Sequence, residues 1–201
     1  MQLAQGDLAG ALKSYRDEVV LQERLAKQDP SNAGWQRTLS VGYEKVGDAQ
    51  FAQGDLAGAL KSHRDEVALQ GRLVKQDPGN ADWQRTLSVG YEKAGNVQLA
   101  QGDLGGALQS YRDYLEIARK LAEQATDNAV WQNNAAWGRY CVAKVLVRIK
   151  GGDRNEARRL TNEGLDIMTR LEHQGALDAN ARDTLNKLNE LARALISSPR
   201  R

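Results

Sequence analysis

The feature that most constrains the fold is a block of sequence that returns every 48 residues. The pentapeptide Ala-Gln-Gly-Asp-Leu begins at residues 4, 52 and 100. Residues 4–51 and 52–99 are identical at 38 of 48 positions, and residues 100–147 keep 19 of those in 52–99. Periods of roughly 20–50 residues are typical of stacked supersecondary units, because one such unit cannot bury its apolar face alone.

Each block contains a Gly-Asp pair that predicts a turn between two helices. Glycine suits the left-handed conformation just past a helix end, as expected for Gly54. Aspartate suits the N-cap of the next helix, as expected for Asp55. The pair recurs at 6–7, 102–103 and 152–153. The last pair begins a fourth block near residue 150, and Glu156 is spaced to complete a capping box with Asp153.

A second boundary in each block is marked by proline or by capping residues. Asp-Pro occurs at 29–30 and 77–78. Proline disfavours a helical conformation of the residue before it, so a helix should end there. Ser31 or Asn32 then caps the next helix. The third block has no proline at 125–128 but keeps Thr, Asp and Asn as capping residues.

Between these boundaries the apolar residues recur every three or four positions, which predicts one apolar stripe per helix. The stripe of the helix predicted at 32–53 is Trp35, Leu39, Tyr43, Val46 and Phe51, and that of the helix predicted at 7–28 is Leu8, Leu12, Tyr15, Val19 and Leu25. The predicted helices are 7–28, 32–53, 55–76, 80–101, 103–124, 128–149, 153–173 and 178–197. Trp35, Trp83 and Trp131 recur at the repeat period and are interpreted as core residues.

The two ends of the chain differ in their predicted roles. The last helix has one apolar and one polar face, which is typical of the terminal cap that repeat arrays need for solubility. Residues 1–175 are therefore interpreted as a repeat array, with starts near 4, 52, 100 and 150. Residues 176–201 are interpreted as a C-terminal capping helix and short tail. Residues 2–5 match the end of a helix at 98–101, so we expect an uncapped front end cut from a longer array.

Composition and charge argue against several classes of protein. The formal net charge is +2, with 28 basic and 26 acidic residues, whereas nucleic-acid binders concentrate Lys and Arg on one face. No apolar run approaches the 18 or so residues that a membrane-spanning helix needs, and the first residues do not resemble a signal peptide. The single cysteine, Cys141, cannot form an internal disulfide, which fits a cytoplasmic setting.

We predict no enzyme, metal site or cofactor, because no catalytic constellation is present. His63 and His173 occupy unrelated repeat positions. His63 stands where Tyr15 and Tyr111 stand in other copies, so it is interpreted as a partly buried packing residue. His173 is interpreted as a surface residue near a helix end. Cys141 is interpreted as a small apolar or groove-lining residue. Residues 58–62 lack the glycine before lysine that a phosphate loop requires.

Residues 46–63 resemble the centre of a tetratricopeptide repeat. The resemblance rests on small residues in the first helix (Gly47, Gly95), the Gly-Asp turn, small residues in the second helix (Ala11, Ala59, Ala107) and an aromatic residue four positions later (Tyr15, Tyr111). It covers about 1–175. The family's usual period is about 34 residues, so these helices are each longer by about two turns. Long repeats of this kind resemble those of kinesin light chains and bacterial signalling proteins.

The resemblance implies an all-α, right-handed α-solenoid of antiparallel helix hairpins, with about eight helices. It also implies that the first helix of each pair lines a concave groove that binds peptides. The implied binding residues of the first copy are Arg37, Glu44, Lys45 and Asp48, beside Val41. Those of the second copy are Arg85, Glu92, Lys93 and Asn96, beside Val89. Those of the third copy are Asn133, Trp137, Tyr140, Lys144 and Arg148, beside Cys141.

We therefore expect a scaffold that binds a protein or peptide partner in this groove. Trp, Tyr and Arg dominate interface energetics, so Trp137, Tyr140, Lys144 and Arg148 are the favoured site for an acidic or C-terminal segment. The alternative for Trp137 is packing against the next helix. Two other functions stay open, namely self-association through the uncapped N-terminal end and a sensor or tether segment in a larger bacterial signalling protein.

A further group of basic residues surrounds the turn at 151–152. Its members are Arg148, Lys150, Arg154, Arg158 and Arg159. We interpret them as a solvated helix end, with a patch for nucleic acid or an acidic peptide as the alternative.

Overall fold

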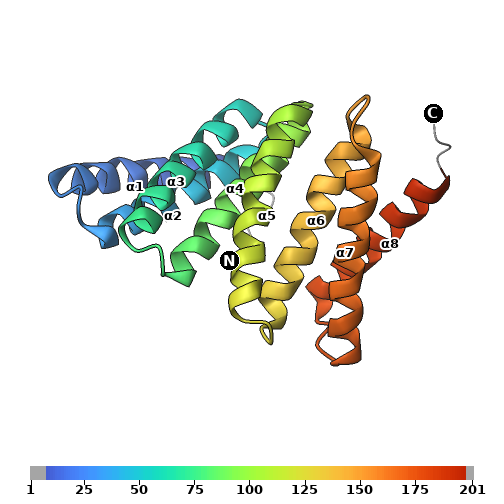
Figure 1. The fold of residues 1–201 in the computed structure, drawn as a ribbon. Coiled ribbons are helices and arrows are strands. Elements are labelled where there is room, and N and C mark those ends of the chain that lie inside the picture. Colours follow the sequence, from blue (N-terminus) through green and yellow to red (C-terminus); the bar gives the residue numbers. More distant parts are fainter. Residues whose placement is uncertain (1–7, 198–201) are drawn as a thin grey trace. The chain divides into compact units, whose positions relative to one another are not determined.

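A computed structural model describes residues 8–197, and within this range the chain is all-helical (Figure 1). The eight helices are α1 (Leu8–Gln28), α2 (Ala33–Ala52), α3 (Leu56–Gln76), α4 (Ala81–Gln101), α5 (Leu104–Gln124), α6 (Ala129–Arg148), α7 (Arg154–His173) and α8 (Ala179–Ser197). The prediction of an all-α fold is confirmed. The expectations for residues 2–5, the turn at 6–7 and the tail after 197 lie outside the described residues.

The chain divides into two compact units, residues 1–103 and 104–201. The first unit contains α1 to α4 and the second contains α5 to α8. Within each unit, consecutive helices pack against each other as antiparallel hairpins (Figure 1). In the second unit α8 packs against both α7 and α6. Right-handed superhelical stacking along the whole chain stays a prediction.

The predicted capping residues begin the helices. Asn32, Asn80 and Asn128 each accept the backbone N–H of the tryptophan three residues later, at 3.1 Å. Asp153 accepts the backbone N–H groups of Asn155 and Glu156, both at 2.9 Å. These bonds satisfy N–H groups that have no partner within the helix. The Glu156 carboxylate, however, pairs with Arg112 of α5 at 2.9 Å, so only half of the predicted capping box is seen.

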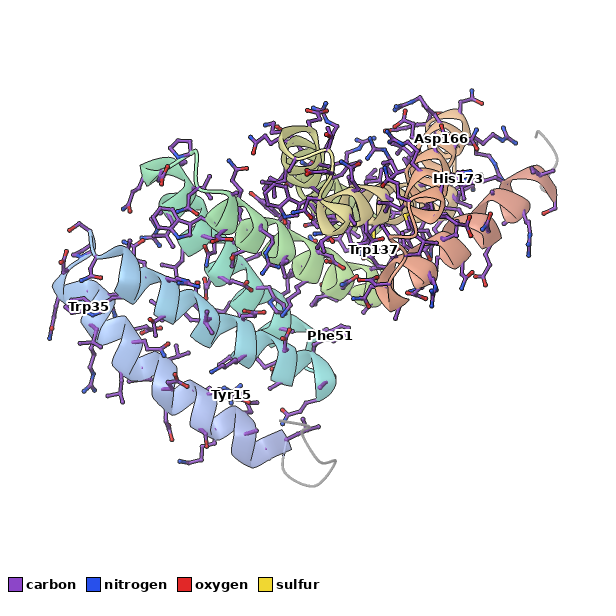
Figure 2. The ribbon with its side chains drawn as sticks, turned by 90° about the horizontal axis from the view of Figure 1, so that it is seen from below. Tyr15, Trp35, Phe51, Trp137, Asp166 and His173 are labelled. Carbon is purple, nitrogen blue, oxygen red and sulfur yellow. The ribbon has the colours of Figure 1, made fainter. Side chains whose placement is uncertain are left out.

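Two of the predicted stripe residues are not buried. Leu25 is 42% exposed and Phe51 is 41% exposed, and Figure 2 shows Phe51 near the end of α2. One buried core cluster of the first unit consists of Leu12, Val19, Leu39, Val46, Ala49 and Leu69. The two exposed side chains lie at helix surfaces that no described helix of their unit covers, so regular spacing alone overestimated the buried stripe.

Consecutive helices approach most closely at glycines. A Cβ atom on Gly42 of α2 would lie 2.8 Å from Val19 of α1, and one on Gly138 of α6 would lie 3.1 Å from Tyr114 of α5. Gly90 of α4 makes the equivalent approach to α3. At the α7–α8 crossing the partners are exchanged. There α7 supplies the glycine, Gly164, and a Cβ atom on it would lie 2.9 Å from Leu188 of α8.

Among residues 8–197, no helix is both long enough and apolar enough to cross a bilayer.

We expect the substitutions Gly138→Ala and Gly71→Ala to change stability in opposite directions. Both glycines lie inside helices, where alanine is favoured by up to about 1 kcal/mol. A Cβ at Gly71 meets nothing within 4 Å, so Gly71→Ala should raise the free energy of unfolding. A Cβ at Gly138 would lie 3.2 Å from the Leu115 Cα, so the helices must separate and stability should fall. Urea denaturation followed by circular dichroism measures both, and a stabilised Gly138→Ala protein would contradict this packing.

Candidate interaction surfaces

In the first unit, one lysine brings predicted residues of α2 and α4 together. The Lys93 Nζ lies 2.7 Å from a Glu44 carboxylate oxygen and 2.7 Å from an Asp48 carboxylate oxygen. Burial alone would lower the pKa of Lys93, but its hydrogen bonds to Asp48 and Glu44 outweigh burial and hold the pKa above its ordinary value. The charges of these three side chains are therefore largely compensated within the chain.

The other predicted residues of this unit remain at the surface to different degrees. Arg37, Lys45 and Arg85 are exposed, whereas Glu92 and Asn96 are half-buried. The Lys45 Nζ lies 5.7 Å from the centroid of the Tyr15 ring on α1, a cation–π distance. Figure 2 shows Tyr15 on that first helix. The exposed members of this group are thus three cations, and its acidic member, Glu92, is half-buried.

Below this surface, His63 of α3 is fully buried, not partly buried as predicted. Its ring lies over Gly47, where a Cβ would be 2.7 Å from the imidazole carbon. The Nδ1 lies 3.2 Å from Glu66, and the Nε2 lies 3.6 Å from Asp48. His63 therefore occupies the predicted packing position, and it also links the buried Glu66 to the surface ion pair around Lys93.

In the second unit, two predicted aromatic residues and two lysines form what we call the aromatic–lysine cluster: Trp137, Tyr140, Lys144 and Lys187. The Trp137 and Tyr140 rings are stacked, with centroids 5.1 Å apart and planes inclined by 28°. The Lys144 Nζ lies 5.2 Å from the Tyr140 centroid, and the Lys187 Nζ lies 4.8 Å from the Trp137 centroid. Trp137 is labelled in Figure 2. Both rings are half-buried, so the cluster is ordered and still reachable.

Sequence reasoning missed the contribution of α8 to this cluster. Lys187 lies on α8 and also pairs with Asp183 at 2.5 Å. Burial raises the pKa of the Tyr140 hydroxyl, with smaller contributions from Cys141, Glu190 and Asp183. The sequence feature that could have revealed Lys187 was the two-residue shift at the fourth block. With that shift, Lys187 falls at the repeat position of Val41, Val89 and Trp137, and α8 takes the place of a fourth first helix.

The remaining predicted residues of α6 are less favourable for a ligand. Asn133 is half-buried and Arg148 is exposed at the end of the helix. Cys141 is fully buried, so it belongs to the core and does not line a groove. The interpretation of Cys141 as a small apolar residue is the one that agrees with the structure.

The basic group around 151–152 does not form a continuous patch. Arg158 donates a hydrogen bond to the Leu195 carbonyl on α8 at 3.0 Å. Arg159 pairs with Glu163 at 2.7 Å. The interpretation of the whole group as a solvated helix end is therefore wrong for Arg158, whose guanidinium holds the last turn of α8.

Three hollows lie between second helices, two of them in the second unit. In the first unit, a cavity of about 530 Å³ is lined by α1 and α3 with α2 as its floor. In the second unit, cavities of about 220 and 400 Å³ are lined by α5 and α7 with α6 as the floor. The floor residues Gln36, Leu39 and Tyr43 lie roughly 140° around α2 from the predicted binding residues, at 3.6 residues per turn.

We expect a pH-dependent gain in stability from the substitution Glu66→Gln. Burial raises the pKa of Glu66, although its hydrogen bond to His63 acts in the opposite direction. Because the folded-state pKa lies above the unfolded value, the stability from the neutral acid is complete at low pH and is lost as pH rises through the folded pKa. Glutamine cannot ionise, so its advantage over Glu66 should grow as pH rises from about 4, the reference pKa of a glutamate, through the raised folded-state pKa.

Urea denaturation at a series of pH values measures this difference. The matched control is Glu18→Gln, at the equivalent position of α1, where the glutamate is exposed. If the free energies of unfolding of the parent chain and the Glu66→Gln variant differed by a constant amount across this range, the assigned burial cost would be contradicted.

Comparisons with known proteins add little beyond the helical repeat fold. No protein-family model and no curated protein matches the chain. One similar solved structure is described as BtubC (BKLC) from P. vanneervenii, with 17% identity and a TM-score of 0.47 over 98% of this chain and 96% of that chain. A de novo designed helical repeat protein, DHR64, has 17% identity and a TM-score of 0.38 over 94% and 96%. These distant likenesses carry no inference about fold or function, and the description of the chain as a helical repeat rests on its 48-residue sequence period and its helices.

Proposed function

We propose that this chain is a tetratricopeptide-type scaffold that binds a peptide or protein segment and performs no chemistry itself. Its hairpins are packed at glycine crossings and capped at their starts, so the surface of each unit is formed before a partner arrives. A preformed surface lowers the entropic cost of binding, because the partner alone must become ordered. The support for a binding surface, rather than for a reaction centre, comes from the arrangement of residues in the second unit.

The observation that carries the proposal is the aromatic–lysine cluster. Half-exposed tryptophan and tyrosine rings provide a large contact area at little cost in side-chain entropy, and such residues dominate measured interface energies. Stacking fixes the Trp137 and Tyr140 rings relative to each other, and the flanking ammonium groups add positive charge. A partner with an apolar side chain next to a carboxylate, either an acidic residue or a C-terminus, matches this combination.

The ion pairs already formed within the chain indicate which cations a ligand's carboxylate would bind. Lys187 already pairs with Asp183, so a ligand must displace that contact to use it. Among the described residues, no ion pair of 4.0 Å or less joins Lys144 or Arg148 to a carboxylate. Lys144 and Arg148 are therefore the favoured partners of the ligand's negative charge, and Lys187 mainly positions the Trp137 ring.

The first unit offers a weaker site for a charged ligand. Lys93 holds both Glu44 and Asp48, so a partner's charge would compete with contacts that are already made. The side chains of Lys93 and Glu44 are only 23% and 31% exposed, so this pair is partly shielded from solvent and a ligand would have to displace it. We therefore expect most of the binding energy to come from the second unit.

We expect the double substitution Lys144→Ala and Arg148→Ala to weaken peptide binding at least tenfold. Peptides selected from a random display library on the immobilised full chain would be titrated by fluorescence anisotropy. Loss of two cations removes the attraction for carboxylate without opening the core, because Arg148 is exposed and Lys144 is only half-buried. Unchanged helicity in circular dichroism confirms that the variant is folded.

The matched control is the double substitution Arg119→Ala and Lys120→Ala on α5, which removes the same number of exposed charges from a surface remote from the aromatic rings. Equal weakening by both variants would mean that binding depends on net charge alone. A selection that enriches no peptide, or peptides that bind both variants as tightly as the parent, would refute the proposed site.

A further inference from the structure

In the second unit, the two hollows between α5 and α7 share part of their lining. One has a volume of about 220 Å³ and the other of about 400 Å³, and Arg119 and Arg139 line both. Arg139 lies on α6, which forms the floor, and Arg119 lies on the α5 wall. The two hollows are therefore treated as one site with arginines where they meet.

The hollow of the first unit lies at the same repeat position but has different chemistry. Glu23 and Tyr43 line it, and the Tyr43 hydroxyl donates a hydrogen bond to Glu23 at 2.7 Å. In the second unit the equivalent residues are Arg119 and Arg139. A hydrogen-bonded acid and phenol are thus replaced by two guanidinium groups.

Three further replacements change the lining of the 220 Å³ hollow. Ala135 stands where the first unit has Leu39, so the floor has lost bulk. Thr126 stands where the first unit has Pro30, so a hydroxyl donor is added. Glu123 replaces a lysine and acts in the other direction, but it is already paired with an arginine of the same helix.

The charges around the two hollows do not cancel. Five arginines and four glutamates line them together. Two of the glutamates each pair with one of these arginines. Glu116 pairs instead with Lys120, which does not line either hollow. Glu163 is shared by Arg139 and Arg159. Two of the five arginine charges therefore have no carboxylate of their own.

Arg139 is held in a fixed orientation with one nitrogen unused. Its side chain is 13% exposed, and its Nε lies 3.1 Å from a Glu163 carboxylate oxygen. Its Nη1 donates to the Ala135 carbonyl at 2.9 Å. Burial would raise the pKa of Glu163, but its hydrogen bonds to Arg139 and Arg159 outweigh burial and lower the pKa. Glu163 thus stays ionised and orients Arg139, whose Nη2 forms no hydrogen bond among the described residues.

Arg170 of α7 is a second available cation. It lines the 220 Å³ hollow and is exposed. Asp166 lies one turn before it on the same helix and is labelled in Figure 2. Within residues 8–197, however, Arg170 forms no ion pair with Asp166 or with any other carboxylate. A ligand would therefore not have to displace an existing partner of Arg170.

We propose that this hollow binds a phosphoryl group through Arg139 and Arg170. A phosphate ester carries a charge of about −1.5 to −2 at pH 7, which matches the two uncompensated arginine charges. Guanidinium groups suit phosphate because their planar donors engage two oxygens at once. The Thr126 hydroxyl provides another donor at the same hollow, and the 400 Å³ hollow beside it has room for the rest of an ester. This site shares no residue with the aromatic–lysine cluster and does not depend on the function proposed for it.

Calorimetric titration of the full chain with inorganic phosphate, at low ionic strength, tests the site. We expect saturable binding of one phosphate per chain. Acetate at matched ionic strength should bind at least tenfold more weakly, because it carries a single charge. Absence of phosphate binding, or equal binding of the two anions, would overturn the proposal.

Two arginines at equivalent repeat positions provide a matched pair of variants. Arg170→Gln removes an available cation and should weaken phosphate binding at least tenfold. Arg72→Gln removes the same charge beside the hollow of the first unit, where Arg72 is also exposed, and should leave binding unchanged. Neither arginine forms an ion pair among the described residues, so both variants should keep the helicity of the parent chain. Equal weakening by the two would mean that net charge alone attracts phosphate, which would overturn the proposal.

A second variant tests the floor of the site. Arg139→Tyr restores the residue that α2 carries at this repeat position, Tyr43, so a helix of this type accommodates it. We expect at least a tenfold loss of phosphate affinity with unchanged helicity in circular dichroism, and unchanged affinity would overturn the role of Arg139. If helicity falls, the comparison of Arg170→Gln with Arg72→Gln still decides the proposal.

A blocked Gly-phosphoserine-Gly peptide distinguishes the two sources of a phosphoryl group. Tighter binding of this peptide than of inorganic phosphate would support a phosphorylated side chain of a partner, because contacts beyond the phosphoryl group would then contribute. Weaker binding would support a free phosphate ion. In either case Arg170→Gln should lower the affinity, and a peptide that binds equally well without its phosphoryl group would overturn the proposal.

Discussion

The packing of a neighbouring helix against glycine is the contact on which the rest of this structure depends. At Gly42, Gly90 and Gly138 the neighbouring helix occupies the space that a side chain would take. This approach fixes how far each helix slides along its partner. Register then decides which side chains meet, because residues one turn apart on a helix differ by about 5.4 Å along its axis. The contact of Lys93 with Glu44 and Asp48 requires that register, whereas the stacking of Trp137 on Tyr140 forms within α6.

The buried polar residues of the first unit give its interior a different character from that of the second. Where the second unit buries Tyr111 and Tyr114, the first buries His63 and Glu66. Burying an ionisable pair costs desolvation energy that hydrogen bonds only partly recover. The chain therefore gives up stability at this point and connects its interior to the surface charges on α2 and α4. The second unit keeps a more apolar interior and exposes its aromatic residues on another face.

Sequence reasoning recovered the helices well because their boundaries are set locally. Asn32, Asp55 and the prolines act within one turn of the chain, so all eight helices begin and end within one or two residues of their predicted limits. Contacts between distant segments were harder to predict. The two-residue shift hid the equivalence of α8 with the earlier first helices, so Lys187 was missed. Spacing also could not reveal that Leu25 is 42% exposed or that Cys141 is buried.

At the α7–α8 crossing the glycine, Gly164, lies on α7 and the larger residue, Leu188, lies on α8. This reversal affects how the chain avoids misfolding. Near-identical repeats can pair with the wrong neighbour, because α2 and α4 present almost the same surface to any second helix. Helix α8 does not share this ambiguity. At the positions equivalent to Gly164, α3 and α5 carry the buried Glu66 and Tyr114, and both would overlap with this leucine. The C-terminal hairpin therefore should not close on α3 or α5 in this register, so errors of exchange are expected mainly among the repeats before it.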